Sequence, residues 1–427
     1  MDITITPTAL KGIVTPPPSK SQAHRLLIAA ALAQGESVIS NVALSQDIAA
    51  TIRCLEELGA YIQMDGSTAT VEGMAAGPMS PLRRMALPHL NCGESGSTLR
   101  FLIPVALAVR GGGIFTGHGR LMERPLDPYA RLFREKGISW ERRDGTLTVS
   151  GRLTPGDYPL PGDVSSQFFT GLLFALPLLA GDSSLVSTTA LESGDYLDMT
   201  LQAMEAFGVS ARREGNIFHI SGGQTYRPAD CAVEADWSNA AFWYVAAGLG
   251  GQVDIQGLNP CSSQGDMRIA AFYTALRREE LARQAGLTPP PAAGRQTLEL
   301  DMGPCPDLVP PVAALAALTP GYDTTLGNAA RLRIKESDRL TAVTQVLSAL
   351  GAEVTELPDA LVIRGQERLA GGVTVDSYND HRIAMMAAVA AIGCRAPVTI
   401  TGAQCVDKSY PNFWEDYEAL GGRLTRR

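Results

Sequence analysis

A pattern of one amphipathic helix followed by two short strands recurs along the chain. Residues 54–73, 132–151, 203–222 and 346–365 each begin with helically spaced apolar residues, pass through a glycine, and then alternate apolar and polar residues as strands do. A truncated copy, EALGGRLTR, starts at Glu418. In every copy we expect the glycine to end the helix in the left-handed backbone conformation, which glycine adopts at little cost.

The spacing of these glycines predicts how the chain is organised. The intervals are 78, 71, 143 and 70 residues, so one copy is missing near residue 280. There, residues 271–300 keep helix-forming residues but carry a Pro/Ala-rich stretch in place of the second hairpin, which indicates a degenerate fourth copy. Six copies of about 70 residues predict two lobes of three units, because each copy is long enough to fold as a unit. The helix-ending glycines are Gly59, Gly137, Gly208, Gly351 and Gly421.

Composition narrows the class of protein. The chain has 427 residues, 45% of them hydrophobic and 19% charged, which is typical of a globular protein with about two domains. A net charge of −8 disfavours nucleic acid and anionic membranes as partners, and no run of 18 apolar residues predicts a membrane span. The seven cysteines contain no C-x-x-C pair, and the N-terminus does not resemble a signal peptide. We therefore expect a cytoplasmic protein with free thiols and no zinc site.

The first candidate for chemistry is the segment PPPSKSQAHRLLIAAALAQG, residues 16–35. Ser19 or Ser21 can cap the apolar helix that follows, which places Lys20 and Arg25 near a helix N-terminus. Free N–H groups, the positive end of the helix dipole and two cations form an anion site. An ordinary capped helix with solvated charges explains this segment equally well.

Three further segments of the first half also place cations or hydroxyl groups near the expected start of a helix. In LNCGESGSTLRFL, glycines and hydroxyls precede a buried helix, although the G-K-[ST] ending of a Walker A loop is absent. Two arginines stand four residues apart in HGRLMERPLDPY, and DVSSQF offers neutral polar groups that on their own indicate a plain helix cap. The residues concerned are Gly96, Arg100, Arg120, Arg124, Ser165, Ser166 and Gln167.

The second half carries denser signals. RLRIKESDRL packs six charged residues into nine positions, NDHR opens an apolar helix, and Asp307 stands between prolines at the head of another. A charge run is usually a solvated face. However, a cation or hydroxyl recurs at a helix start in seven places, so eleven of the 36 cations are expected to surround anions. They are Lys20, Arg25, Arg100, Arg120, Arg124, Arg331, Arg333, Lys335, Arg339, Arg382 and Lys408.

The motifs PPSKSQAHR, ESGSTLRFL, RLMERP, DVSSQF, LRIKESDRL, NDHRIAM and DKSYPNF resemble, in order, those of the EPSP synthase family of enolpyruvyl transferases. The resemblance implies an α/β protein, a two-lobed inside-out α/β barrel of six βαβαββ units. It implies that residues 19–231 form one lobe and that residues 1–18 and 232–427 form the other. The active site is expected in the cleft between the lobes. The resemblance implies transfer of the enolpyruvyl group of phosphoenolpyruvate to the 5-hydroxyl of shikimate 3-phosphate, in aromatic amino acid biosynthesis. No metal or organic cofactor and no macromolecular partner is implied, and we expect a monomer.

The resemblance also implies roles for individual residues. The reaction needs an acid and a base, and Asp307 as hydroxyl base and Glu336 as proton carrier are the candidates, with Lys20 stabilising the departing phosphate. The expected residues for shikimate 3-phosphate are Lys20, Ser21, Arg25, Ser165, Ser166, Gln167, Ser193, Tyr196, Asp307 and Lys335. The expected residues for phosphoenolpyruvate are Lys20, Gly96, Arg124, Gln167, Arg339, Arg382 and Lys408.

Two departures and two rival functions remain open. Glu94 and Arg331 stand where the family or some relatives have Asn, and Glu94 bears on affinity for phosphoenolpyruvate. The related transferase acting on UDP-N-acetylglucosamine uses a reactive cysteine around the third motif, and residues 110–125 contain none. A non-catalytic anion-binding homologue would be expected to lose its carboxylates, whereas Asp307 and Glu336 are present.

Overall fold

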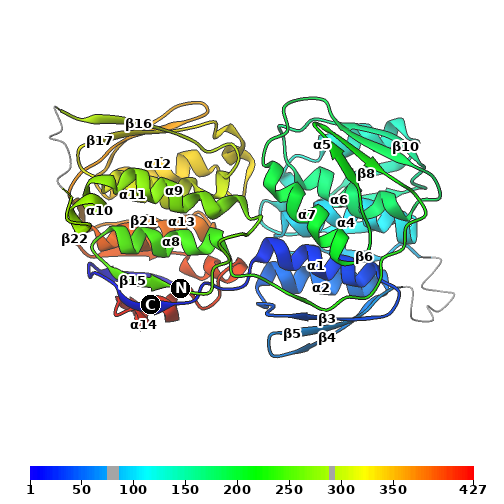
Figure 1. Cartoon of the computed structure of the whole chain (residues 1–427), viewed down its shortest axis with the longest axis horizontal. Coiled ribbons are helices and arrows are strands. Elements are labelled where there is room, and N and C mark those ends of the chain that lie inside the picture. Colours follow the sequence, from blue (N-terminus) through cyan, green and yellow to red (C-terminus); the bar gives the residue numbers. More distant parts are fainter. Residues whose placement is uncertain (75–85, 288–293) are drawn as a thin grey trace. The chain divides into compact units, whose positions relative to one another are not determined.

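The computed structural model describes residues 1–74, 86–287 and 294–427. The chain forms two compact units, and the chain path is shown in Figure 1. Unit 1 comprises Met1–Pro17 and Ala235–Arg427, and unit 2 comprises Pro18–Glu234. Each unit buries a hydrophobic core of its own. In the described ranges, no helix has the length and apolar character that crossing a membrane requires.

Unit 2 alternates helices with short strands. Its helices are α1 (Lys20–Leu32), α2 (Gln46–Leu58), α4 (Gly96–Arg110), α5 (Asp127–Glu135), α6 (Gln167–Ala175) and α7 (Gly194–Ala206). Its strands are β3 (Glu36–Ser40), β4 (Tyr61–Asp65), β5 (Thr68–Glu72), β6 (His89–Asn91), β7 (Gly112–Thr116), β8 (Ser139–Arg143), β9 (Thr146–Ser150), β10 (Gly156–Leu160), β11 (Ser183–Ser187), β12 (Arg212–Glu214), β13 (Ile217–Ile220) and β14 (Cys231–Ala232).

Unit 1 is likewise built of helices and short strands. Its helices are α8 (Trp237–Gly248), α9 (Ile269–Leu276), α10 (Arg278–Gln284), α11 (Val309–Ala317), α12 (Arg339–Ala349), α13 (His381–Ile392) and α14 (Phe413–Ala419), with 3₁₀ turns η3 (Gly265–Arg268), η4 (Pro306–Leu308) and η5 (Ala330–Ile334). Its strands are β1 (Ile3–Thr6), β2 (Lys11–Val14), β15 (Gln252–Ile255), β16 (Gln296–Asp301), β17 (Tyr322–Gly327), β18 (Glu353–Glu356), β19 (Leu361–Arg364), β20 (Leu369–Gly371), β21 (Thr374–Asp376), β22 (Cys394–Ala396), β23 (Val398–Thr401) and β24 (Arg423–Arg426).

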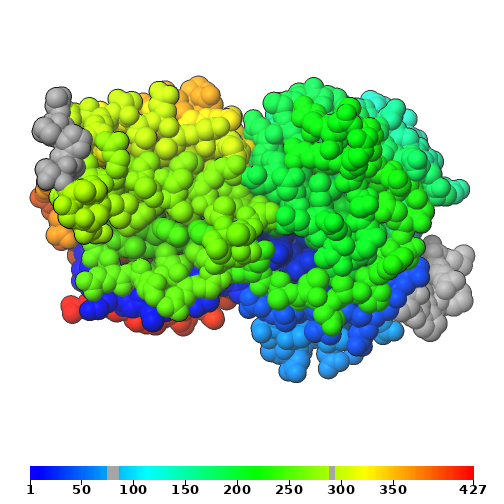
Figure 2. Space-filling model, viewed as in Figure 1, coloured from blue at the N-terminus to red at the C-terminus, as the bar shows by residue number. Residues whose placement is uncertain are grey.

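One sheet topology recurs in both units. Each four-stranded sheet begins with a parallel pair and continues with two antiparallel strands, as in β6-β7-β9-β8 and β16-β17-β19-β18. In the hairpin of β4 and β5, more buried residues alternate with more exposed ones, and this hairpin lies at the surface of unit 2 in Figure 2. The remaining sheets of this type, over the described residues, are β14-β3-β5-β4, β10-β11-β13-β12 and β21-β23-β1-β24.

The fourth copy differs from the others. Its sheet consists of the parallel pair β2 and β15, and the described part of residues 271–300 forms α9, α10 and β16 rather than a hairpin. Residues 288–293 of the Pro/Ala-rich stretch lie outside the described residues. The copy nevertheless contains a helix-ending glycine, Gly286, which follows α10. The repeat pattern in the sequence did not reveal this glycine.

The glycines end their helices as predicted. All five have positive φ, between 74° and 119°, and Gly286 joins them at 74°. In each case the N–H of the next residue donates to the carbonyl five positions earlier, the hydrogen bond of a Schellman cap. These bonds are Ala60 to Leu55, Ile138 to Phe133, Val209 to Met204, Leu287 to Ala282, Ala352 to Leu347 and Gly422 to Tyr417, at 2.8–3.1 Å.

Several helices are buried on all sides, which determines where polar residues can lie. Every residue of α11 and of α13 is buried, and α8, α4 and α6 are nearly so. A helix of this kind tolerates polar side chains chiefly at its ends, where backbone groups also lack intrahelical partners. Several predicted site residues lie at helix N-termini: Lys20 is the first residue of α1, Gly96 of α4, Gln167 of α6 and Arg339 of α12.

Candidate active site

The chemistry of unit 1 centres on the buried guanidinium of Arg339, whose side chain is 1% exposed. Its Nη1 donates to Asp307 Oδ1 at 2.7 Å, its Nη2 to Glu336 Oε2 at 2.6 Å, and its Nε to Asp380 Oδ2 at 2.7 Å. Asp380 also caps α13 by accepting from the Arg382 N–H. Both predicted catalytic carboxylates therefore contact the same cation.

Asp307 contacts Arg339 and lies close to two further cations, Arg382 and Lys335. Arg382 Nη2 donates to Asp307 Oδ2 at 3.1 Å, and Lys335 Nζ lies 3.7 Å from Oδ1. Burial acts to raise the pKa of Asp307, but Arg382, Lys335 and Arg339 outweigh burial and hold this pKa well below its ordinary value. The side chain is still 20% exposed, so a ligand can reach it.

Lys408, a further predicted cation of this unit, is the last residue of the 3₁₀ turn η6 (Ala403–Lys408). Its side chain is buried, and Nζ donates to the Asn379 carbonyl at 2.6 Å, directly before the cap of α13. Asn379 has a φ of 51°, a left-handed conformation that is uncommon outside glycine. The lysine is thus held beside the turn that carries Asp380 and Arg382.

In unit 2, the predicted Arg25 is fully enclosed. Its guanidinium donates to the Ser21 and Tyr196 carbonyls and to Thr200 Oγ1, at 2.7–2.9 Å. Its Cζ lies 5.2 Å from the centre of the Phe101 ring. Burial lowers the pKa of Arg25 to about 10. Within the described part of the chain no carboxylate pairs with it, which suits an anionic ligand.

Lys20 stands one residue after the cap of α1, Ser19, whose Oγ accepts from the Gln22 N–H. Lys20 Nζ donates to Asp47 Oδ2 at 2.8 Å, and both side chains are largely buried. Asp47 lies in the first turn of α2. Lys20 stands in a recognisable motif, whereas nothing in the sequence marks Asp47, the carboxylate that orients it.

Gly96 and Arg124 lie against each other. A Cβ atom at Gly96 would come within 2.6 Å of Arg124 Nη1, which is closer than real contacts allow. Arg124 is 7% exposed. Next to them, Arg100 Nη1 donates to Gln167 Oε1 at 2.7 Å, and Gln167 Nε2 donates to Ser97 Oγ. The structure therefore brings together the starts of α4 and α6, which carry predicted phosphoenolpyruvate residues.

The predicted hydroxyl residues occupy two turns. Ser165 Oγ accepts from the Gln167 N–H, whereas Ser166 occupies the cap position of α6 without a side-chain capping bond. Ser193, directly before α7, is buried with a φ of 54°. Such strained conformations cluster at functional sites. Tyr196 lies in the first turn of α7, and its carbonyl accepts from Arg25.

The two residues that depart from the family pattern have defined surroundings. The carboxylate of Glu94 lies against Gly119, and Oε1 is 3.9 Å from His118 Nε2. Arg331 Nη2 donates to the Gly303 carbonyl, so it braces the loop before Asp307.

Sequence reasoning missed residues whose partners are distant along the chain. Asp380 was noted at a helix start but given no role, and Asp47, Thr170, Thr200, Ser238 and Asp266 gave no local signal. Ser238 Oγ accepts from Arg382 Nη2 at 2.9 Å and donates to Asp266 Oδ2 at 2.5 Å. Only the fold brings these side chains together.

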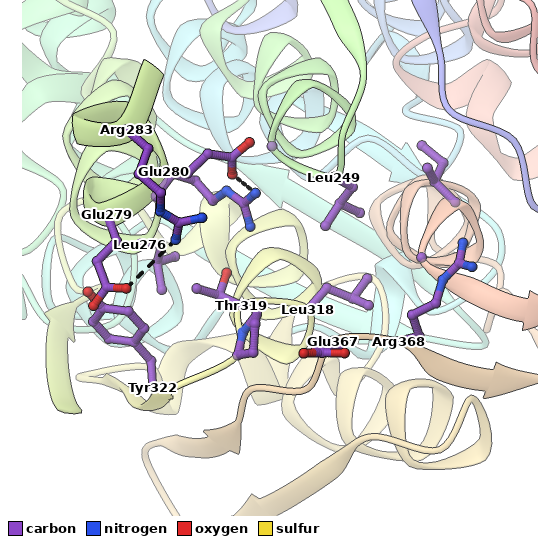
Figure 3. A pocket seen from close by; sticks show the side chains of 15 residues that line it. Leu249, Leu276, Glu279, Glu280, Arg283, Leu318, Thr319, Tyr322, Glu367 and Arg368 are labelled. Atoms are coloured by element: carbon purple, nitrogen blue, oxygen red, sulfur yellow. Dashed lines mark ion pairs between the residues drawn. The ribbon is translucent and has the colours of Figure 1, made fainter. Parts of the chain in front are cut away.

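A cavity of about 430 Å³ lies elsewhere in unit 1 and contains none of the predicted residues (Figure 3). It borders Gly248, Leu318 and Ile392, at the C-terminal ends of α8, α11 and α13. The charged cluster lies at the N-terminal ends of these same helices. The cavity walls carry ion pairs, Arg277 with Glu280 and Arg283 with Glu279, so it is chemically distinct from the cation-rich cluster.

Comparison with known proteins gives a consistent result. Residues 5–417 match the family model described as EPSP synthase (3-phosphoshikimate 1-carboxyvinyltransferase). The 3-phosphoshikimate 1-carboxyvinyltransferase of Clostridium kluyveri is 46% identical to the chain, over 99% of this chain and 98% of that protein. The 3-phosphoshikimate 1-carboxyvinyltransferase of Clostridioides difficile is 42% identical, over 98% of this chain and 97% of that protein. The solved EPSP synthase of Acinetobacter baumannii matches with a TM-score of 0.75 at 25% identity, and both chains are covered completely.

Proposed function

The chain belongs to the EPSP synthase family, and from this premise we propose that it transfers the enolpyruvyl group of phosphoenolpyruvate to the 5-hydroxyl of shikimate 3-phosphate, releasing phosphate. The observation that carries the proposal is the cluster in which Asp307 and Glu336 share the buried Arg339. Two carboxylates at this cation can supply the acid and the base that the transfer needs, which a protein that only binds anions does not require.

The charges of the candidate site suit these substrates. Each substrate carries a phosphate and a carboxylate, and planar guanidinium groups bind both with two parallel hydrogen bonds. Arg25, Arg339 and Arg382 are each at least 94% buried, so water screens their charges weakly. Because the whole chain has a net charge of −8, binding depends on such local cations.

We assign the substrates to the predicted residues. Shikimate 3-phosphate is held by Lys20, Ser21, Arg25, Ser165, Ser166, Gln167, Ser193, Tyr196, Asp307 and Lys335. Phosphoenolpyruvate is held by Lys20, Gly96, Arg124, Gln167, Arg339, Arg382 and Lys408.

The electrostatics of Asp307 set a condition on its role as the base that removes the hydroxyl proton. In the unliganded protein, Arg382 and Arg339 hold Asp307 ionised, and a carboxylate stabilised in this way accepts a proton poorly. Anionic substrate groups that bind these arginines draw on the same positive charge, so the pKa of Asp307 rises when the substrates arrive. Glu336, which also contacts Arg339, enters the step protonated and donates its proton to the methylene carbon, while Asp307 holds the hydroxyl proton until the phosphate leaves.

The finer architecture is part of the same proposal. The recurring sheets support six βαβαββ-type units, three in each lobe of an inside-out α/β barrel, with the unit at β2 and β15 degenerate. We further propose that the protein is a monomer that works in the cytoplasm without a cofactor. None of the seven cysteines, all of which the structure describes, forms a disulfide, which supports a reducing compartment.

The test is phosphate release by the purified protein. Release that requires both phosphoenolpyruvate and shikimate 3-phosphate is expected, and Asp307→Asn and Glu336→Gln should each lower turnover at least about a hundredfold. Ser165→Ala serves as the control and should mainly raise the KM for shikimate 3-phosphate. Release that requires UDP-N-acetylglucosamine instead, or no release at all, would overturn the proposal.

A further inference from the structure

Asp266 is a buried carboxylate next to the candidate site that the proposed reaction does not use. It lies in η3, is 3% exposed, and accepts a 2.5 Å hydrogen bond from Ser238 Oγ through its Oδ2. The same hydroxyl oxygen accepts from Arg382 Nη2 at 2.9 Å. A continuous chain of contacts therefore runs from Asp266 through Ser238 and Arg382 to Asp307.

The turn that carries Asp266 is fastened to the start of α8. Gln264, two residues earlier, accepts from the Trp237 N–H at 3.1 Å and donates to the Ala235 carbonyl at 2.9 Å. Its own N–H donates to Ser262 Oγ. Since Ser238 is the second residue of α8, this clamp fixes the distance between the carboxylate and the hydroxyl.

We infer that Asp266 is a positioning residue that orients Arg382 for phosphoenolpyruvate through the Ser238 hydroxyl. The inference rests on the proposed function, which assigns Arg382 to that substrate. An ionised Asp266 draws the Ser238 hydrogen toward itself, which leaves an oxygen lone pair directed at Arg382. Without this acceptor the hydroxyl can rotate, and the guanidinium loses one of the groups that fix its plane.

The charges around Asp266 make the arrangement sensitive to pH. Asp307 of η4, Asp236 at the start of α8 and Arg382 of α13 face it, whereas Arg268 of the same turn donates to the Gly265 carbonyl. Burial and the negative charge of Asp307 raise the pKa of Asp266 to about 6, against the opposing effect of Arg382. The carboxyl is therefore ionised at pH 7.5 and largely protonated near pH 5.

The first experiment separates binding of the two substrates. Asp266→Ala and Ser238→Ala should each raise the KM for phosphoenolpyruvate roughly tenfold, because a hydrogen bond to a charged group is lost, and leave the KM for shikimate 3-phosphate within about twofold. Asp266→Asn, which keeps an acceptor for Ser238, should not raise the KM for phosphoenolpyruvate at pH 7.5. Asp416→Asn is the control, since Asp416, although only half-buried, is also a carboxylate that accepts a hydrogen bond from a hydroxyl, that of Tyr410.

The second experiment uses pH. Ionised Asp266 competes with the incoming anion for the charge of Arg382, so the ratio of wild-type KM to Asp266→Asn KM for phosphoenolpyruvate should rise between about pH 5 and pH 7.5. The ratio cancels the titration of the substrate's own phosphate, which is the same in both assays. A ratio that stays constant would overturn the pH effect.

The outcomes distinguish this inference from the proposed function. If the wild-type protein releases no phosphate from the two substrates, the proposed function fails. If the wild type is active but Ser238→Ala and Asp266→Ala leave the KM for phosphoenolpyruvate unchanged, or raise both KM values equally, Asp266 does not position Arg382. Should Asp266→Ala fold poorly in a thermal melt, Ser238→Ala decides the matter, because it removes only a hydroxyl.

Discussion

At the scale of single residues, the candidate site consists of cations whose partners restrict their movement. Arg339 meets three carboxylates, whereas Arg25 meets carbonyls, a threonine hydroxyl and an aromatic ring. Burial lowers the pKa of Arg25 and would lower that of Arg339, but the carboxylates raise the pKa of Arg339 above its ordinary value. Carboxylates of the protein thus neutralise the charge of Arg339, whereas neutral groups surround Arg25. Of the two arginines, only Arg25 needs a bound anion to neutralise its charge.

Gly96→Ala should selectively weaken phosphoenolpyruvate binding. The new Cβ would lie 2.6 Å from Arg124 Nη1, so the guanidinium has to move away from the start of α4. We expect the KM for phosphoenolpyruvate to rise at least about tenfold, the cost of one charged hydrogen bond. Steady-state kinetics measures this, and Gly327→Ala, where a Cβ meets nothing within 4 Å, is the control. An unchanged KM in Gly96→Ala would mean that Arg124 does not serve this substrate.

At the scale of elements, the recurring unit is a helix closed by a Schellman cap and followed by strands. Gly286 shows that the cap persists in the fourth copy even where the hairpin is absent. The helix stop is thus the most constant part of the repeat, because only a residue without a Cβ takes a positive φ at little cost. The strands vary more, since their pairing depends on neighbours elsewhere in the sheet.

Substituting two of these glycines separates conformational strain from steric contact. Gly286→Ala should lower the free energy of unfolding by about 1 kcal/mol, because the left-handed conformation disfavours alanine but no atom lies within 4 Å of the new Cβ. Gly351→Ala should cost more, about 2 kcal/mol, because its Cβ would also meet Ala370 at 3.2 Å. Urea denaturation compares the two variants. Equal losses would show that the Ala370 contact relaxes freely.

At the scale of the whole molecule, charged chemistry and packed cores are kept apart. The predicted catalytic groups lie at helix starts, whereas five of the seven cysteines are buried, and burial raises the pKa of Cys92, Cys394 and Cys405. Cys261 is exposed, and its N–H donates to Asn259 Oδ1. Within the described ranges no three His, Cys, Asp or Glu residues are grouped as metal ligands.

Thiol alkylation should therefore leave the reaction intact. Iodoacetamide at neutral pH is expected to modify Cys261 first, since reaction requires an accessible thiolate, and phosphate release should change less than about twofold. Mass spectrometry of the alkylated peptides together with the activity assay measures both. Loss of activity in step with alkylation would indicate a catalytic cysteine, as in the transferase that acts on UDP-N-acetylglucosamine.

The sequence by itself determined the features that depend on neighbours within a few residues. Helix-ending glycines, a cap at Ser19 or Ser21, and cations at helix starts such as Lys20 and Arg382 follow from local backbone geometry and from the unpaired N–H groups of a helix N-terminus. These features fixed the repeat and the motifs that resemble the family. The resemblance in turn implied both candidate catalytic carboxylates, Asp307 and Glu336.

Tertiary structure alone decided which partner each of these groups has. Arg339 meets Asp380 from 41 residues away, Arg25 meets Thr200 from 175 away, and Arg382 meets Ser238 from 144 away. A buried charge needs a partner, but any of many polar residues can supply it, so no local pattern records the choice. Asp266 is the clearest case, because its neighbourhood in the sequence is unremarkable and its surroundings in the fold give it a role.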